Sequence, residues 1–131
     1  MYFEQTSTGI RFVRRTKTSG SVVNNLIEQS AWNVDTLDGS GKEKNPSAIT
    51  LDPTKGNVFQ IKYQWLGFGT IKFFIEHADD GLLHLVHTIA YANTNTTPSV
   101  DNPTLPLCLA AKNTSNTSDI VLRSGSLAGF V

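Results

Sequence analysis

Apolar residues recur mostly at every second position of this chain, in short runs, and not at the three- and four-residue spacing of an amphipathic helix. Residues 10–17 and 58–65 show the alternation best. It is typical of a strand with one face buried and the other in water. No window combines a helical apolar stripe with capping residues. The pattern therefore predicts strands and little or no helix.

Further β-rich runs are separated by Gly, Pro, Asn and Asp, the residues that favour turns. The expected strands are 10–17, 22–23, 48–51, 58–65, 70–76, 82–91, 107–112 and 120–123, with 127–131 as a strand end. About seven to nine short strands at this spacing predict an antiparallel β-sandwich, jelly-roll-like, as one domain over residues 1–131.

Three connections have turn chemistry of their own. Residues 79–81, Asp-Asp-Gly, predict a hairpin turn, because Asp-Gly accommodates positive φ. Gly67 and Gly69 interrupt an apolar run and indicate a bulge or sharp bend, with Gly67 at positive φ. Residues 29–32 predict a turn or one helical turn.

The composition suits one domain of low charge. Lys and Arg number 11, Asp and Glu number 11, and charged residues make up 17% of the 131 residues. The chain opens on Tyr2-Phe3 without a lead-in, so we expect a terminal domain or a segment of a longer protein. Nucleic-acid binders normally carry a clear basic excess, so nucleic acid is not an expected partner.

The sequence predicts neither a targeting or membrane segment nor a reactive cysteine. The N-terminus lacks the basic start and apolar run of a signal peptide, and no stretch approaches the roughly 20 apolar residues of a membrane helix. No membrane partner is therefore expected. Cys108 lies in an apolar run without cationic neighbours, which predicts a small buried hydrophobe and not a nucleophile.

The segment from Asn33 to Gly39 invites a calcium interpretation, because Asp35 and Asp38 lie close together in a loop. The EF-hand spacing would place an oxygen ligand at Leu37, and no bidentate Glu follows at the right distance. Asp and Gly also form loops without metal. No ion and no other cofactor is therefore predicted.

The three histidines do not assemble a zinc site on regular strands. His84 and His87 are three positions apart, an odd offset that sends them to opposite faces, and His77 alone does not complete a ligand set.

No nucleophile elbow, phosphate loop, dinucleotide motif or HExxH motif occurs, so we expect no enzyme. Trp32 and Trp65 could form a sugar-stacking platform, but core packing is the usual role of Trp on a sandwich strand. The burial of the two indoles distinguishes these alternatives.

Several ordered motifs resemble a pattern in virion proteins of phages and large viruses. The first is W-N-x-D-x-L-D-G-x-G, the second W-L-G-x-G, and His87 and 102–106, N-P-T-L-P, follow in the same order. The matching positions are Trp32, Asn33, Asp35, Asp38, Gly39, Gly41, Trp65, Leu66, Gly67, Gly69 and His87. The insertion 42–45 departs from the shorter loop of the family.

The resemblance implies a structural protein of the virion with a β-sandwich fold, located in the particle as capsid decoration, minor capsid, fibre or tail component. Its partners would be other virion proteins and copies of itself, for example in a trimer. The apolar ends Tyr2-Phe3 and Phe130-Val131 favour such assembly, because exposed apolar surface marks interfaces. The alternative is an adhesion module that binds a host glycan or surface receptor through end loops. We also expect the 32–41 loop to fold over the 64–69 turn and stiffen one end.

Overall fold

The computed structural model describes residues 1–104 and 106–130. Leu105 and Val131, which the sequence assigned to a loop motif and to a strand end, lie outside the described residues. The chain divides into two units, residues 1–101 and residues 102–131. We call the first the body and the second the arm.

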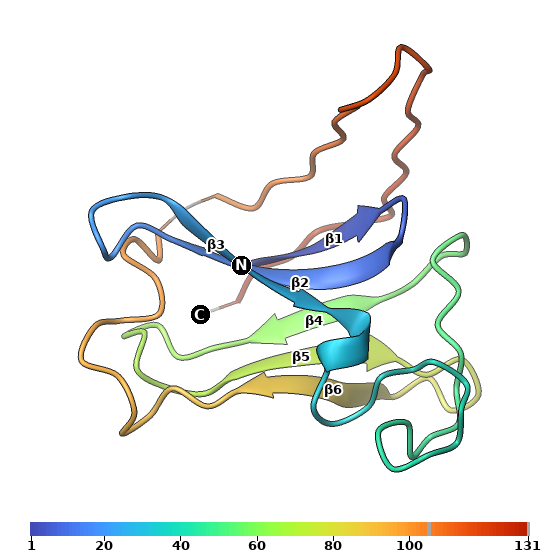
Figure 1. The fold of residues 1–131 in the computed structure, drawn as a ribbon, viewed down its shortest axis with the longest axis horizontal. Helices are drawn as coiled ribbons and strands as arrows, with labels where there is room; N and C mark the ends of the chain where they lie inside the picture. Colours follow the sequence, from blue (N-terminus) through green and yellow to red (C-terminus); the bar gives the residue numbers. More distant parts are fainter. Residues whose placement is uncertain (105, 131) are drawn as a thin grey trace. The chain divides into compact units, whose positions relative to one another are not determined.

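The body contains two antiparallel three-stranded sheets (Figure 1). Each sheet is a meander of consecutive strands, in the orders β1-β2-β3 and β4-β5-β6. The strands are β1 (Tyr2–Thr6), β2 (Gly9–Thr16), β3 (Val23–Glu28), β4 (Phe59–Lys62), β5 (Ile71–Glu76) and β6 (Leu83–Ile89). The predicted all-β, sandwich-like fold is confirmed. The strands of the two sheets do not interleave as they would in a jelly roll.

The first half of β2 follows the alternation of its sequence, although Val13, the next residue after Phe12, is also buried. Ile10 and Phe12 of β2 point into the core, and Arg11 between them points outward. Arg11 lies opposite both Glu4 of β1 and Glu28 of β3, and its guanidinium contacts their carboxylates at 2.6 and 3.1 Å. This ladder of three charges joins all the strands on the outer face. Each exposed pair contributes little by itself, but the ladder fixes the register.

The second sheet contains a β-bulge. Phe73 pairs with His87 and Phe74 pairs with Leu85, so Val86 is the extra residue of β6. A bulge shifts the side-chain alternation by one position. As a result Val86 and His87 are both buried, although they are neighbours in sequence.

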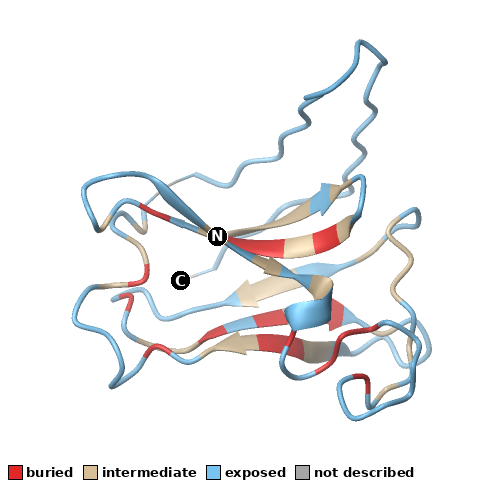
Figure 2. Ribbon diagram, viewed as in Figure 1, coloured by how far each residue is buried: buried red, intermediate tan, exposed pale blue. Residues whose placement is uncertain are grey.

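A stack of three aromatic rings crosses the core. Phe12 lies between Trp32 and Phe73, with both ring-centroid distances at 4.3 Å and the rings nearly parallel. Phe3 meets Phe12 and Phe73 edge-on. Figure 2 shows the buried positions on β2, β5 and β6, where the two sheets face each other. Such stacked and edge-on contacts stabilise the core beyond the burial of their area.

Some local predictions are confirmed. Gln29–Ala31 forms a single 3-10 turn. The Asp79–Gly81 turn closes the β5–β6 hairpin, with Gly81 at φ +65° and a hydrogen bond from the His77 N–H to the Leu82 carbonyl. Gly67 adopts φ +78°, as its place in the interrupted strand predicted.

Other expected strands are absent from the described residues. The 48–51 segment makes only one isolated bridge, between Asp38 and Thr50. Residues 107–112 and 120–123 form no strand, so six strands replace the expected larger number. Apolar β-branched residues favour strands only when a partner strand accepts their backbone hydrogen bonds. In these segments no described strand does so.

The arm therefore adds no described strand to either sheet. Its described residues contain no helix and no strand, and all but Pro103 are exposed. All six described strands lie within residues 1–101, whereas the sequence predicted one sandwich domain over residues 1–131. Phe130, at the apolar end singled out in the sequence, is 95% exposed. Phe3, at the other apolar end, packs against the core.

Candidate functional site

The long loop after Trp32 is built around the buried carboxylate of Asp35. That carboxylate accepts hydrogen bonds from the backbone N–H groups of Leu37 and Ser47, at 3.0 and 3.2 Å, and from the Asn45 side-chain amide at 2.6 Å. Burial raises the pKa of Asp35, but the hydrogen bonds from Ser47, Leu37 and Asn45 outweigh it and hold the pKa below its usual value. These donors occupy the space beside the oxygens where a cation would bind.

Asn45 is a structural residue that the sequence did not single out. It is fully buried, and its amide also donates to the Ile49 carbonyl while its oxygen accepts from the Gly41 N–H. It lies in residues 42–45, which are interpreted from the sequence as an insertion relative to the virion-protein pattern that the motifs resemble. The Asn-Pro pair was the only available signal, because Asn before Pro often begins a turn.

The other end of the loop is joined to β6. The N–H groups of Val34 and Asp35 donate to the Val86 carbonyl at 3.2 and 3.0 Å. Asn33 exchanges hydrogen bonds with the backbone of Thr88, and its own N–H donates to His87 Nδ1 at 3.2 Å. Burial lowers the pKa of His87, which favours the neutral imidazole whose Nδ1 can accept this bond. The bulge at Val86 thus supplies the acceptors that anchor the loop.

The W-L-G-x-G motif contacts a different segment. The Gly67 N–H donates to the Gln64 carbonyl, and the Gly67 carbonyl accepts from the Ser99 N–H at 2.7 Å. A Cβ on Gly67 would lie 2.8 Å from Pro98 Cβ, so only glycine fits this turn. The expectation that the 32–41 loop covers this turn is not met. The loop bonds to β6, whereas the turn bonds to residue 99.

The two tryptophans have different environments. Trp32 is 1% exposed and belongs to the core, as predicted. Trp65 is 45% exposed, so its predicted core role is wrong. Strand β4 ends at Lys62, before the alternation of 58–65 reaches Trp65. Tyr63, Trp65, Leu66 and Phe68 are all exposed along the chain that follows, and we call these four residues the aromatic loop.

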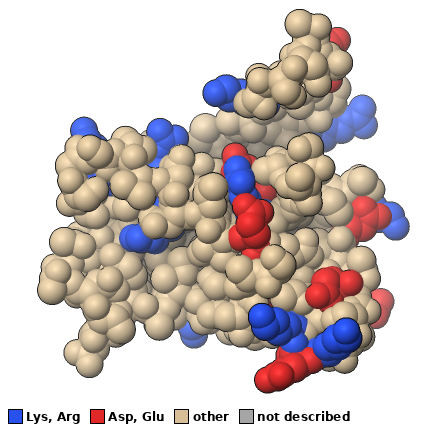
Figure 3. All heavy atoms as spheres, viewed as in Figure 1, with Lys and Arg blue, Asp and Glu red and all other residues tan. Residues whose placement is uncertain are grey.

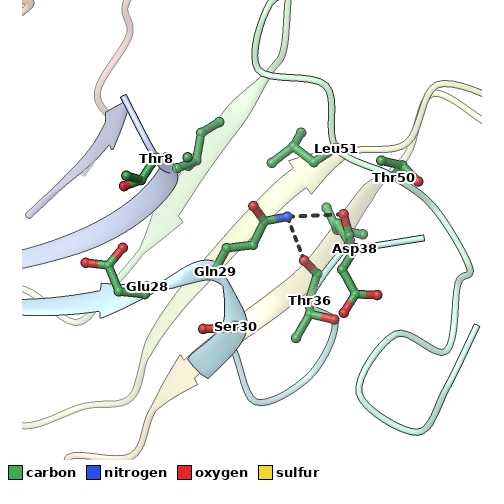
Figure 4. Close-up of a pocket in the computed structure, with 11 residues that line it drawn as sticks. Thr8, Glu28, Gln29, Ser30, Thr36, Asp38, Thr50 and Leu51 are labelled. Carbon is green, nitrogen blue, oxygen red and sulfur yellow. Dashed lines mark hydrogen bonds between the residues drawn. The ribbon is translucent and has the colours of Figure 1, made fainter. Parts of the chain in front are cut away.

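An open groove of about 640 Å³ lies between the β1–β2 turn and the long loop (Figure 4). Its lining residues are Thr8, Gly9, Ile10, Glu28, Gln29, Ser30, Thr36, Leu37, Asp38, Thr50 and Leu51. The Gln29 amide donates to the carbonyls of Thr36 and Leu37, at 2.8 and 3.1 Å, and so holds the groove's edge (Figure 4). Gln29 lies in the predicted turn 29–32, but the sequence does not predict these hydrogen bonds.

The groove is lined both by polar side chains and by the aliphatic side chains of Ile10, Leu37 and Leu51. Asp38 is exposed at its rim, and hydrogen bonds from Ser40 lower the pKa of its carboxyl below the usual value. Glu28 is engaged by Arg11 at 3.1 Å. Hydroxyl groups and the exposed Asp38 carboxylate, beside buried aliphatic residues, can hold a polar ligand by hydrogen bonds, but these lining residues form no nucleophile–base pair.

The histidines are arranged differently from the prediction. Because of the bulge, His84 pairs with Ile75 and His87 pairs with Phe73, and residues 73 and 75 share one face. His84 and His87 therefore lie on the same face, and the predicted opposite faces are wrong. His77 lies beside His84, with ring centroids 4.9 Å apart, and Asp80 contacts His84 Nε2 at 2.9 Å. Within residues 1–104 and 106–130 no three His, Cys, Asp or Glu side chains form a metal-binding group.

Cys108 is exposed in the arm, so its predicted burial is wrong. The prediction relied on an apolar neighbourhood in sequence, and that neighbourhood packs into no described core. No helix in the described part of the chain is long and apolar enough to cross a membrane.

Charged side chains are sparse on the face drawn in Figure 3, and most of that face carries neither Lys or Arg nor Asp or Glu. Comparison of the chain with protein-family models, with curated proteins and with solved structures gave no match. The resemblance to virion proteins stays a prediction from the motifs.

Proposed function

We propose that the chain is a non-catalytic structural protein of a virus or phage particle, which acts by packing against other protein chains. The observation that carries the proposal is the amount of apolar surface outside the core. Leu66, Leu82 and Val121 are between 62% and 74% exposed, and 16 further large apolar residues are also exposed. Several of these residues are neighbours in sequence, as in Trp65–Leu66 and in residues 120–122, and contiguous exposed apolar surface usually marks an interface.

Low charge supports the same proposal. Charged residues make up 17% of the chain, and the formal net charge is zero. Interface cores are depleted in charged residues, and a weakly charged surface opposes close packing of identical copies less than a strongly charged one. The ordered motifs from Trp32 to His87 resemble those of virion proteins, and this resemblance supports a virus or phage particle as the site of the packing.

The proposal is tested by the mass of the purified chain in solution, measured by light scattering after gel filtration over a range of concentrations. We expect a closed oligomer, such as a trimer, whose fraction rises with concentration. A mass that equals 14.3 kDa at every concentration would count against self-assembly.

The aromatic loop favours a second candidate, adhesion to a host glycan. Tyr63, Trp65 and Phe68 are 41%, 45% and 42% exposed within six residues, and exposed rings can stack on sugar faces. On a glycan array, Trp65→Ala should abolish any signal, whereas Leu82→Ala, another exposed apolar position, should not change it. No signal from the unaltered protein would remove this candidate.

A further inference from the structure

The arm carries apolar side chains that the single chain leaves in water. Seven large apolar residues among its described positions are exposed: Leu107, Leu109, Ile120, Val121, Leu122, Leu127 and Phe130. Among them Val121 is 74% and Phe130 is 95% exposed. Charged residues are few in the arm, namely Lys112, Asp119 and Arg123. A segment of this composition gains free energy when another apolar surface covers it.

The backbone N–H and C=O groups of the arm's described residues also form no hydrogen bonds with other backbone groups. The arm follows an extended course out to a tip and back (Figure 1), yet no backbone–backbone hydrogen bond joins its described residues. The tip, residues 113–118, is held by side chains instead: the Asn113 amide donates to the Ser118 carbonyl at 2.6 Å and to Asn116 Oδ1 at 2.7 Å. An extended segment with free N–H and C=O groups can add as a strand to the edge of a sheet.

The body offers such an edge in β3. It is one of the two outer strands of the first sheet, and its residues Val23 and Leu26 are 41% and 50% exposed. Between Val23 and Glu28 the only charged residue is Glu28 itself. Natural edge strands usually carry charges, proline or bulges that prevent pairing, and β3 has one charge at its end. The outer edge of β6, by contrast, already accepts the N–H groups of Val34 and Asp35 at Val86.

The area available matches that of a stable contact. Complete burial of seven large apolar side chains removes on the order of 400–800 Å² of apolar surface from water. A standard protein interface buries about 800 Å² on each partner. Each copy would give its own arm and accept the arm of another copy. In a dimer this contact occurs twice, and in a larger oligomer it closes a ring. The arms alone would therefore supply an interface of sufficient size.

We propose that the arm of one copy adds as a β-strand to the β3 edge of a second copy, with the 120–122 segment as its centre. The proposal rests on the assembly role proposed above and names the segment and the surface through which copies associate. The strand that pairs with the β3 edge therefore comes from another copy of this chain. Unlike a flat patch, a strand addition specifies both register and direction through the backbone.

Hydrogen–deuterium exchange and solution mass of the full chain test it together. Val121→Asp in the arm and Leu26→Asp on β3 should each weaken association by roughly tenfold or more, because pairing would bury a charge. Thr114→Asp at the arm's tip and Ala78→Asp at an exposed position of the β5–β6 turn add the same charge elsewhere, and both should associate as the unaltered chain does. Amides 119–123 and 23–28 should exchange more slowly in the oligomer than after dilution. Thermal melts of all four variants verify that the body stays folded.

The alternative outcomes separate the two proposals. An oligomer that keeps its mass in Val121→Asp and Leu26→Asp, with unprotected arm amides, would overturn the strand addition and leave assembly through another surface. A monomer with protected arm amides would show the arm covering its own body, which also overturns the proposal. A monomer with unprotected arm amides would contradict both this proposal and self-assembly.

Discussion

At the scale of single residues, the aromatic stack and the buried imidazole determine how the core responds to change. Trp32 lies against Phe12 at 4.3 Å, and Phe12 lies against Phe73 at the same distance, so the stack of three rings links the long loop to both sheets. His87 lies beside this stack, 5.8 Å from Phe12, and accepts the Asn33 N–H. Core packing and loop position therefore depend on the same few side chains.

Trp32→Ala should destabilise the protein by about 3–5 kcal/mol, because it removes a buried aromatic ring and leaves a cavity. Trp65→Ala is the matched control at a 45% exposed position and should change the free energy of unfolding by less than about 1 kcal/mol. Urea denaturation of the two variants measures both values. Equal losses in the two variants would contradict the different environments of the two indoles.

His87 makes stability depend on pH. Its pKa is lowered by burial in the folded state, whereas the unfolded chain has a pKa of about 6.5, so the unfolded state binds protons first as the pH falls. The contribution of neutral His87 is present above about pH 6.5 and declines as the pH falls through that value. Urea midpoints between pH 8 and pH 5 should show this decline, and His87→Gln should show less of it. The same decline in both proteins would assign it to other groups.

At the scale of elements, the sequence predicted what depends on local chemistry. The Asp79–Gly81 turn, the 3-10 turn at 29–31 and the positive φ of Gly67 follow from residue type and nearest neighbours. The bulge in β6 could not be predicted, because it depends on the pairing of Phe73 and Phe74 with another strand. That one extra residue reversed the predicted faces of His84 and His87. The apolar runs of the arm were predicted as strands, because composition does not reveal whether a partner strand exists.

The long loop depends on one carboxylate. In Asp35→Asn an amide would replace an oxygen that accepts N–H donors, and we expect a loss of about 1–3 kcal/mol in the free energy of unfolding. Asp79→Asn, at a side chain that is 91% exposed, is the control and should be nearly neutral. Because hydrogen bonds lower the pKa of folded Asp35 below its unfolded value, its contribution is present above about pH 4 and is lost in stronger acid. The melting temperatures of Asp35→Asn and of the unaltered chain should therefore differ more at pH 7 than at pH 3.

The W-L-G-x-G turn depends on Gly67. Gly67→Ala should cost about 1–2 kcal/mol or more, because the residue has φ +78° and a Cβ would approach Pro98. Gly56→Ala, where a Cβ meets open space, is the control and should have little effect. If Gly67→Ala melts at the temperature of the unaltered protein, the turn does not have the described conformation.

At the scale of the whole molecule, the chain combines a small sandwich with an exposed apolar arm. The sequence predicted the all-β architecture from the period of its apolar residues, which the two meander sheets confirm. It could not predict the division at residue 101, because the arm has the same strand-forming composition as the body. The exposed apolar side chains of both units support the proposal that the protein functions in an assembly.

The most direct test of that proposal is quantitative peptide mass spectrometry of density-purified particles from a culture that expresses the protein. A structural protein of the virion should be present in the particle band, in a fixed ratio to the main shell protein across independent preparations. Its peptides should stay there after washing with high salt, because packing of apolar surface is not weakened by screening. Recovery of the protein only outside the particle band, or in a ratio that varies between preparations, would contradict the account.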